Sequence, residues 1–278
     1  MYRFFLFLLA CLCLACEETE VPQAPEQLVV EGWIDSGGFP VVKLTTTIAV
    51  SKQLQSTDSL ERHLLRWAKV TVSDGQREVV LTGMPRNDFF PPYIYTTSDM
   101  RGEVGKIYTL RVDYMQFHAH ATTTIPKPVP LTSIVAEPLP LYPSYYKLRA
   151  DFNDDPTTTD YYKVFVSQDN EQSDYHSTHI GTFNDRFLPT HASVIINNAR
   201  QNVVNPKGTF FKQDETVYIK FCHIDSTSYE FWKTMDDYQG EGRNPLFNSM
   251  QNIRSNIHGG LGYWCGYGVS YHVFDVVE

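Results

Sequence analysis

Ala68-Lys69-Val70-Thr71-Val72-Ser73-Asp74-Gly75, followed by Glu78-Val79-Val80-Leu81-Thr82, carries the strongest fold signal in this sequence. Apolar and polar side chains alternate in the first run, which is typical of a β-strand with one buried face. The dipeptide Asp74-Gly75 favours the tight turn of a two-residue hairpin. Residues 68–82 therefore predict an antiparallel β-hairpin.

Five further runs of β-favouring residues surround this hairpin in the first half of the chain. They are Leu28–Ile34, Val41–Thr47, Tyr93–Thr96, Tyr108–Tyr114 and Phe117–Ile125. Seven short strands separated by turns are typical of an immunoglobulin-like sandwich. Helices do not alternate with these strands, as they would in a parallel α/β fold. We therefore expect a mainly β fold, with residues 28–126 forming an N-terminal β-sandwich domain.

A proline-rich segment, Pro126-Lys127-Pro128-Val129-Pro130, marks the predicted end of this domain, because alternating prolines favour stiff, extended backbone. Residues 131–278 are expected to form a second, fibronectin-like sandwich. Its predicted strands are Ser133–Ala136, Lys147–Phe152, Tyr161–Val166, Thr216–Cys222 and Val269–Val277. The second and third of these are expected to be neighbours, and the polar segment Asp169–Asn198 is expected to be irregular.

One helix is predicted near residues 227–239 of the second domain. Thr227-Ser228-Tyr229-Glu230 fits a capping box, which satisfies free backbone N–H groups at a helix start. Phe231, Met235 and Tyr238 follow at helical spacing, and Gly240 ends the pattern. This aromatic stripe predicts core packing rather than a ligand site.

The N-terminus predicts export and lipid attachment. Arg3 and the apolar run Phe4–Leu14 describe a signal peptide covering residues 1–15, too short to span a bilayer. Leu14-Ala15-Cys16 resembles a bacterial lipobox, so Cys16 is the predicted lipidation site. Cys11 is the alternative, and Cys16 is preferred because it leaves a longer apolar run before the cleavage point.

Residues 16–27 are acidic and contain Pro22 and Pro25, which predicts a tether between the lipid and the first domain. Acidic residues directly after a lipidated cysteine resemble the signal that sends Bacteroidota lipoproteins to the cell surface. The alternative is a simple solvated linker. The formal net charge of −9 argues against nucleic acid or anionic lipid as the main partner, so membrane contact is expected through the lipid anchor alone.

Two cysteines, Cys222 and Cys265, remain in the mature chain beyond Cys16. Export to an oxidising compartment allows a disulfide between them. The alternative is two separate buried thiols that act as small apolar side chains. The sequence leaves both alternatives open.

Several weak motifs together resemble a known family. They are the lipobox, Val29–Ile34, Tyr108–Val112, Tyr229-x-Phe231-Trp232, Asn244-Pro245, Asn252-Ile253 and Gly259-Gly260-x-Gly262-Tyr263. With these motifs the chain resembles the Bacteroidota outer-membrane lipoproteins grouped as domain of unknown function 4249, over nearly its whole length. The resemblance implies an outer-membrane lipoprotein associated with a TonB-dependent transporter. That family has no established catalytic residues, so none is transferred.

Candidate metal ligands are weak. His118 and His120 lie on one face of a predicted strand and could begin a zinc site, but nothing in the sequence brings His176 and His179 to them. Asp151, Asp154 and Asp155 could bind calcium, but their spacing fits no EF-hand loop. Solvated histidines and turn-forming acids are the preferred interpretations, and neither a metal nor a cofactor is predicted.

The glycine-rich tail carries the strongest candidate for recognition. Tyr263, Trp264 and Tyr267 lie among five glycines and could form a loop that binds a partner or ligand. The preferred alternative is a tight fold-back that places these rings in the core. No hydrolase, nucleotide-binding or dinucleotide-binding motif occurs, so no catalytic residue is predicted.

The sequence-level hypothesis is a surface-exposed, lipid-anchored accessory protein that binds a TonB-dependent outer-membrane β-barrel and aids substrate capture or complex assembly. A structural or adhesive surface lipoprotein is the alternative. A hydrolase built from scattered residues is less favoured than either. The substrate is not specified by the sequence.

Overall fold

The computed structural model describes residues 25–47, 63–168, 174–198, 209–241 and 253–277. The predicted signal peptide 1–15, the lipidation residue Cys16 and all but the end of the predicted tether 16–27 lie outside the described residues. So do Asn244-Pro245 and Asn252. The described chain is mainly β with one helix, as the sequence predicts.

The first half of the chain contains all seven predicted strands. They are β1 (Leu28–Asp35), β2 (Pro40–Thr46), β3 (Lys69–Ser73), β4 (Glu78–Pro85), β5 (Tyr93–Thr96), β6 (Ile107–Tyr114) and β7 (Phe117–Thr124). The predicted hairpin is β3–β4, with Ser73 opposite Glu78. Its turn lies one residue later than predicted, because the Asp74 amide donates to the Arg77 carbonyl and Gly75 takes a φ of 85°.

The second half contains the single helix among the described residues and eight strands. They are β8 (Leu131–Leu139), β9 (Tyr142–Asn153), β10 (Tyr161–Ser167), β11 (His176–Asn184), β12 (His191–Ile196), β13 (Phe211–Lys212), β14 (Thr216–Ile224), α3 (Ser226–Glu241) and β15 (Leu261–Asp275). The expectation that residues 169–198 are irregular is wrong, since β11 and β12 lie there. Their buried residues include Thr178, Thr182 and Ala192, which give no apolar alternation in the sequence.

The expectation that Lys147–Phe152 and Tyr161–Val166 form neighbouring strands is also wrong. β9 belongs to a four-stranded sheet with β8, β12 and β13, whereas β10 belongs to an eleven-stranded sheet. The two strands face one another across the sandwich, where the rings of Phe152 and Tyr162 pack edge to face at 5.1 Å.

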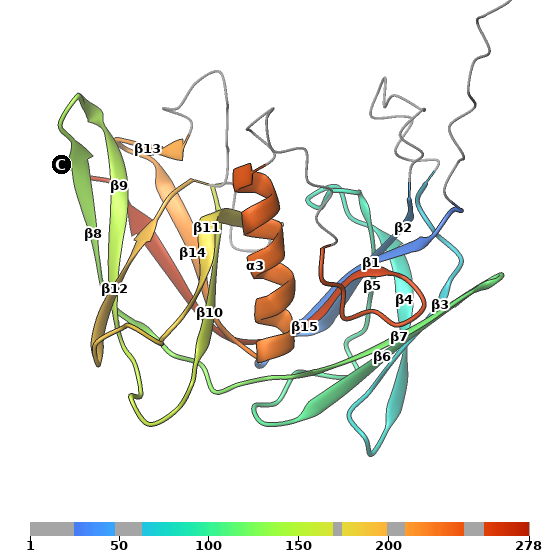
Figure 1. Cartoon of the computed structure of the whole chain (residues 1–278). Helices are drawn as coiled ribbons and strands as arrows, with labels where there is room; N and C mark the ends of the chain where they lie inside the picture. Colours follow the sequence, from blue (N-terminus) through green and yellow to red (C-terminus); the bar gives the residue numbers. More distant parts are fainter. Residues whose placement is uncertain (1–24, 48–62, 169–173, 199–208, 242–252, 278) are drawn as a thin grey trace, which may run out of the picture.

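The larger sheet runs through both halves of the chain, in the order β11-β10-β14-β15-β1-β2-β5-β4-β3-β6-β7. Strand β15 joins the halves, because residues 261–267 pair in parallel with β1 and residues 267–275 pair antiparallel with β14. Figure 1 shows β15 running from the N-terminal strands toward the C-terminal half, past the lower end of α3. The division into domains 28–126 and 131–278 therefore stays a prediction.

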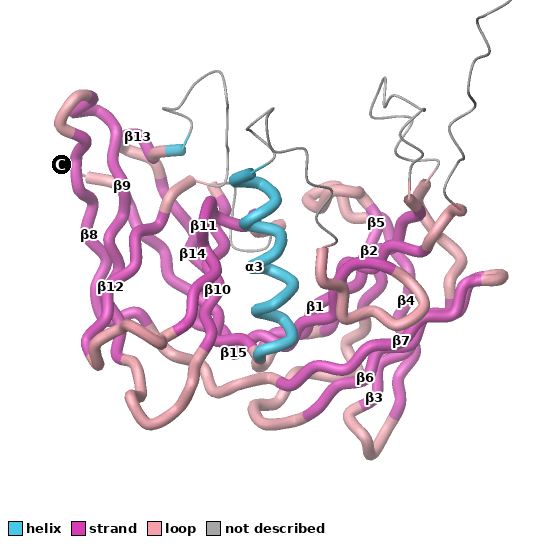
Figure 2. The backbone as a smooth tube through the Cα atoms, viewed as in Figure 1, coloured by secondary structure: helices cyan, strands magenta, loops and turns pink. Residues whose placement is uncertain are grey.

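Three apolar clusters fill the molecule. One is enclosed by β1–β7, which curl around it, and includes Trp264 from β15. The second lies between the two sheets of the C-terminal half. The third lies between α3 and the other face of β10, β14 and β15, where Figure 2 shows α3 standing against the strands.

The glycines of the tail allow another segment to cross β15. A Cβ on Gly266 would lie 2.6 Å from the Thr124 carbonyl oxygen, and one on Gly268 would lie 2.3 Å from that of Pro126. Real Cβ atoms do not come this close, so only glycine permits the crossing. The end of β7 and the proline-rich connection thereby pack directly on the last strand.

Helix α3 begins two residues earlier than the predicted capping box. Asp225, not Thr227, caps it, since Asp225 Oδ1 accepts a hydrogen bond from the Ser228 amide at 2.7 Å. Asp225 Oδ2 also accepts from the Thr123 hydroxyl and the Thr124 amide at 2.9 and 3.0 Å. The cap therefore also fastens the helix to β7.

Candidate functional site

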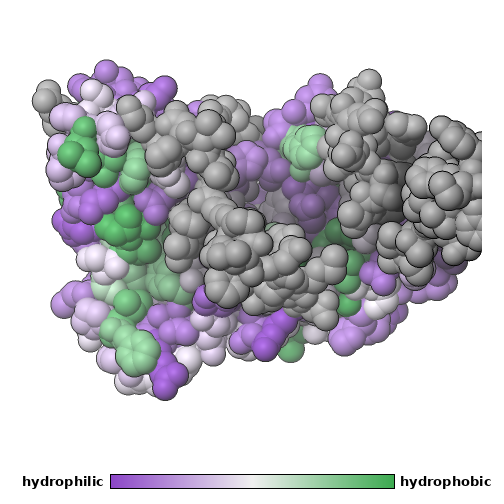
Figure 3. All heavy atoms as spheres, turned by 45° about the horizontal axis from the view of Figure 1, so that its top comes forward, coloured by the Kyte–Doolittle hydropathy of each residue, from purple (hydrophilic) through white to green (hydrophobic). Residues whose placement is uncertain are grey.

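A cavity of about 440 Å³ opens beside α3, where the two halves of the chain meet. Its base is one continuous face of the large sheet. In β1 the odd-numbered residues Glu31, Trp33 and Asp35 point into it while Val30 and Ile34 point into the core, as alternation in a strand requires. In the space-filling view the surface is hollowed between the two halves, and hydrophilic residues are visible there (Figure 3).

Strand pairing brings residues from both halves into this face. Glu31 lies opposite Lys43 on β2 and beside Tyr263 on β15, and Asp35 lies beside Tyr267. Aromatic rings supply most of the remaining wall. The rings that line the cavity are those of Trp33, Phe39, Phe89, Phe90, Phe165, Tyr175, Trp232, Tyr263, Tyr267 and Tyr271.

The first charged group in the cavity is centred on Lys43. Its ammonium contacts Glu31 Oε2 at 3.1 Å and Asp174 Oδ2 at 3.0 Å, and it donates to the Phe90 carbonyl at 3.1 Å. Burial acts to lower the pKa of Lys43, but the two carboxylates together outweigh it and raise that pKa. Lys43 is therefore charged, and all three of its N–H groups have partners.

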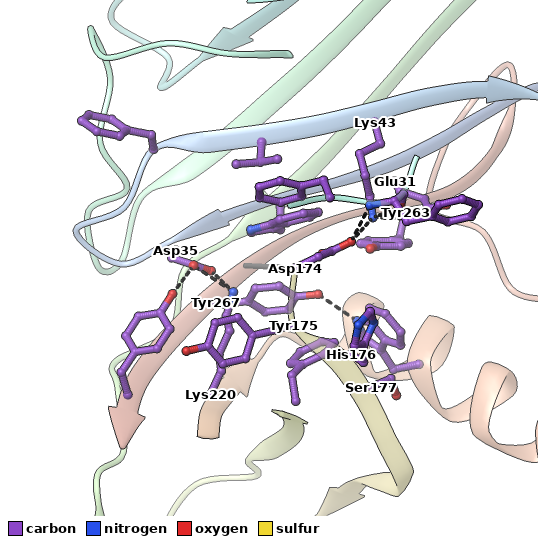
Figure 4. A pocket seen from close by; sticks show the side chains of 18 residues that line it. Glu31, Asp35, Lys43, Asp174, Tyr175, His176, Ser177, Lys220, Tyr263 and Tyr267 are labelled. Carbon is purple, nitrogen blue, oxygen red and sulfur yellow. Dashed lines mark hydrogen bonds and ion pairs between the residues drawn. The ribbon is translucent and has the colours of Figure 1, made fainter. Parts of the chain in front are cut away.

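The second charged group is centred on Lys220 of β14. Its ammonium binds both oxygens of Asp35, at 2.7 and 2.8 Å. The Tyr271 hydroxyl donates to Asp35 Oδ2 at 2.6 Å, and the Lys220 ammonium lies 4.7 Å from the centre of the Tyr267 ring. Figure 4 shows the two charged groups on separate parts of the cavity wall, with Tyr267 between them.

Comparison with known protein families identifies the family of this chain. Residues 17–271 match the family model described as domain of unknown function DUF4249. The chain belongs to this family. No curated protein matches the sequence.

In this DUF4249 member the three aromatic residues considered for a binding loop lie in a strand. Tyr263, Trp264 and Tyr267 belong to β15 and are at most 8% exposed. The strand begins at Leu261, eight residues before the predicted Val269, because Leu261 to Tyr267 pair with β1. Its two faces differ: Tyr263 and Tyr267 line the cavity, while Trp264 enters the N-terminal core and donates to the Tyr108 carbonyl at 3.0 Å.

Cys222 and Cys265 are free, buried thiols in the structure, so the disulfide alternative is not formed. The pairing explains why: Cys222 lies opposite Val269, and Cys265 lies four residues from Val269 on the same strand. Four residues of strand span about 13 Å, beyond the reach of a disulfide. Burial raises the pKa of the Cys265 thiol to about 12, which makes it unreactive at neutral pH.

The histidines considered as candidate ligands do not converge on one site, and the preferred interpretation of His118 and His120 is solvated side chains of a strand. His118 bonds to Asp113 at 2.7 Å, and His120 stacks on His258 with ring centres 4.9 Å apart. His176 lies instead at the cavity, and the side chain of His179 is outside the described part of the structure. Neither strand histidine belongs to a group of three metal-ligating side chains within the described ranges.

The predicted acidic turn is only partly correct. Asp151 lies in β9, where hydrogen bonds from Ser133, Ser193 and Arg149 lower its pKa to about 2. Asp155 does form a turn, accepting from the Thr157 amide at 3.0 Å.

Asp154 has a different setting, since it lies with Asp160 and Asp185. These three carboxylates offer oxygens within 4.8 Å of one another, close enough to share a cation. Hydrogen bonds from the Tyr162 and Thr158 hydroxyls and from the Asp160 amide already reach the cluster. No metal is assigned to it, and the absence of a cofactor stays a prediction.

The charged residues of the cavity were missed by sequence reasoning. A signal was available, because Lys43 and Lys220 each interrupt an apolar run, Val41-Val42-Lys43-Leu44 and Ile219-Lys220-Phe221. A lysine inside a buried strand needs a carboxylate partner, which marks it for attention. Asp174 could not have been found, since it lies 131 residues from its partner Lys43.

Proposed function

We propose that this protein is a lipid-anchored, surface-exposed accessory protein of a TonB-dependent outer-membrane transporter, and that it holds the transporter's substrate in the cavity beside α3. The observation that carries the proposal is the cavity itself. Its volume of about 440 Å³ is within the range of small-ligand sites, which are mainly aromatic and apolar with a few fixed polar groups.

The lining favours binding over catalysis. Lys43 and Lys220 are each held by carboxylates, so neither is a free nucleophile. The hydroxyl of Ser177, which follows His176 in β11, donates to the Thr178 carbonyl rather than to the imidazole. Ser177 is the one serine, threonine or cysteine among the described lining residues, so no hydroxyl or thiol of these types is paired there with a base, the arrangement that serine and cysteine catalysis uses.

The sequence supports the cellular setting of the proposal. The lipobox at Cys16 supplies a membrane anchor, and bacterial lipoproteins carry more than one acyl chain, which holds a protein firmly. None of the described helices has the length and apolar character needed to cross a membrane. An anchor at one end of a tether raises the effective concentration of the cavity near a barrel in the same membrane.

The test is a pulldown from native outer membranes in mild detergent, using a C-terminal tag and mass spectrometry of the co-purified proteins. We expect a TonB-dependent barrel in stoichiometric amount. Recovery of the protein with lipid but without a barrel would contradict the transporter association and support an independent surface adhesin.

The matched control is Cys16→Ala, which removes the predicted acyl chains and leaves the described residues unchanged. We expect this variant to leave the membrane fraction and to lose palmitate labelling. Continued labelling in Cys16→Ala would overturn the anchor assignment, and labelling in Cys11→Ala shows whether the other cysteine contributes.

A further inference from the structure

We propose that the cavity binds an organic cation, an ammonium or guanidinium group on an apolar or aromatic body, with Glu31 and Asp174 as its counterions. This inference rests on the proposed role of the cavity as a ligand site and names the chemical class of the ligand. It follows from the hydrogen-bonding capacity left in the cavity and from the nature of its rings.

The charges of the cavity are unequal. Among the described residues its lining contains three carboxylates, from Glu31, Asp35 and Asp174, and two ammonium groups, from Lys43 and Lys220. The four chain segments that supply these residues therefore bring one more negative than positive group to the cavity. A ligand with a positive charge balances the cavity, whereas an anionic ligand increases its imbalance.

Around Lys43 the unused hydrogen-bonding capacity is of the acceptor kind. Lys43 has already given its three N–H groups to Glu31, Asp174 and the Phe90 carbonyl. Glu31 and Asp174 each use one oxygen for Lys43, and the second oxygen of each accepts nothing from the described residues. Two carboxylate oxygens are thus available to a donor from a ligand.

Lys220, the second lysine of the cavity, is a poor binding group for an anion because its charge already has a partner. Lys220 binds both oxygens of Asp35, and rings surround the rest of its ammonium group, with Trp33 at 5.7 Å and Tyr267 at 4.7 Å. Its charge is therefore neutralised locally. An incoming carboxylate would have to displace Asp35, which the Tyr271 hydroxyl also holds.

The rings favour a cation as well. An aromatic face is negative and attracts ammonium groups, and the protein's own lysines show this here. Lys43 and Lys220 lie 5.5 and 5.7 Å from the centre of the Trp33 ring. Trp33 is in turn stacked on Phe89 at 6.2 Å, which fixes a ring platform beside Glu31 and Asp174.

The test compares three probes of the same shape and different charge: phenethylammonium, 2-phenylethanol and 3-phenylpropionate. Each is titrated by calorimetry into the full chain in non-ionic detergent, with detergent alone subtracted. We expect saturable binding of phenethylammonium and at least about tenfold weaker binding of the other two, the effect of one charge-assisted hydrogen bond.

Variants locate the binding. Glu31→Gln and Asp174→Asn should each weaken phenethylammonium binding about tenfold. The double variant Glu31→Gln/Asp174→Asn reverses the excess charge, so 3-phenylpropionate should then bind more tightly than phenethylammonium, a gain that misfolding does not produce. Asp151→Asn, a carboxylate of the opposite sheet, is the matched control and should change nothing.

Three results would overturn the inference: equal binding of all three probes, preferred binding of the anion by the unchanged chain, or no saturable binding of the cation at millimolar concentration. Each leaves the pulldown result intact. A retained barrel together with any of these results rejects the cation and keeps the transporter association, whereas loss of the barrel with cation binding does the reverse.

Discussion

Lys163 beneath α3 and Lys43 at the cavity are both buried in the large sheet, yet their surroundings shift the pKa values of the two lysines in opposite directions. Lys163 of β10 is fully buried and bonds to Asp236 of α3 at 3.1 Å and to the Thr182 hydroxyl at 2.9 Å. Burial lowers its pKa to about 8, and Asp236 offsets this only in part. Lys43 of β2 has two carboxylate partners, and its pKa is raised.

The difference shows what separates a structural charge from a candidate binding group. One carboxylate is too few to compensate for the lost hydration of Lys163, so that pair fastens the helix to the sheet at an energetic cost. At Lys43 the carboxylates exceed the cation, and the surplus faces a cavity. A buried charge with surplus counterions, rather than burial alone, indicates the functional region.

The largest expected effect on stability comes from removing Asp236, the counterion of the buried Lys163. Asp236→Ala leaves the Lys163 ammonium buried and unpaired, and the Thr182 amide loses its acceptor as well. We expect a loss of about 3–5 kcal/mol in the free energy of unfolding, measured with urea. Lys163→Met/Asp236→Leu is the control and should cost much less; equal costs for both would contradict the account.

A change of intermediate size in the free energy of unfolding is expected when pH is varied through the titration range of Lys163. The folded pKa of Lys163, about 8, lies below its ordinary value of 10.5, so between these pH values the unfolded chain binds the extra proton. Stability from this group therefore rises as pH increases from about 8 to 10.5, by at most about 3 kcal/mol.

The pH experiment compares unfolding of the unchanged chain and of Lys163→Met/Asp236→Leu across that range. The difference between them should move in favour of the unchanged chain as pH rises. The raised pKa of Lys43 has the opposite sign, because its contribution is present below 10.5 and is lost as pH rises through the folded pKa. A constant difference between the two proteins would show that Lys163 does not titrate in this window.

The smallest effect on stability is expected from a substitution in the cavity. In Glu31→Gln, Lys43 keeps Asp174 and the Phe90 carbonyl, and the Glu31 side chain is 38% exposed. Removing a partly exposed charge pair should cost about 0–1 kcal/mol of stability. Urea unfolding tests this, and a loss as large as that of Asp236→Ala would erase the distinction between the two lysines.

The sequence by itself determined the strands whose inner face is regularly apolar. All seven strands of the first half and the one described helix were predictable from alternation, turns and spacing. β11 and β12 were not, because the inner residues Thr178, Thr182 and Ala192 carry no apolar pattern. The glycines of the tail indicated an unusual backbone conformation. They did not indicate that Gly266 and Gly268 make room for a segment that crosses the strand.

Only the tertiary structure decided the cavity and its charges. Local sequence specifies which face of a strand is buried, since side chains alternate every two residues. It does not specify which distant strand becomes the neighbour. The parallel pairing of β1 with β15 places Glu31 beside Tyr263, and the contact of Lys43 with Asp174 joins residues 131 positions apart. Such pairings depend on the packing of the whole chain, which no short stretch of sequence contains.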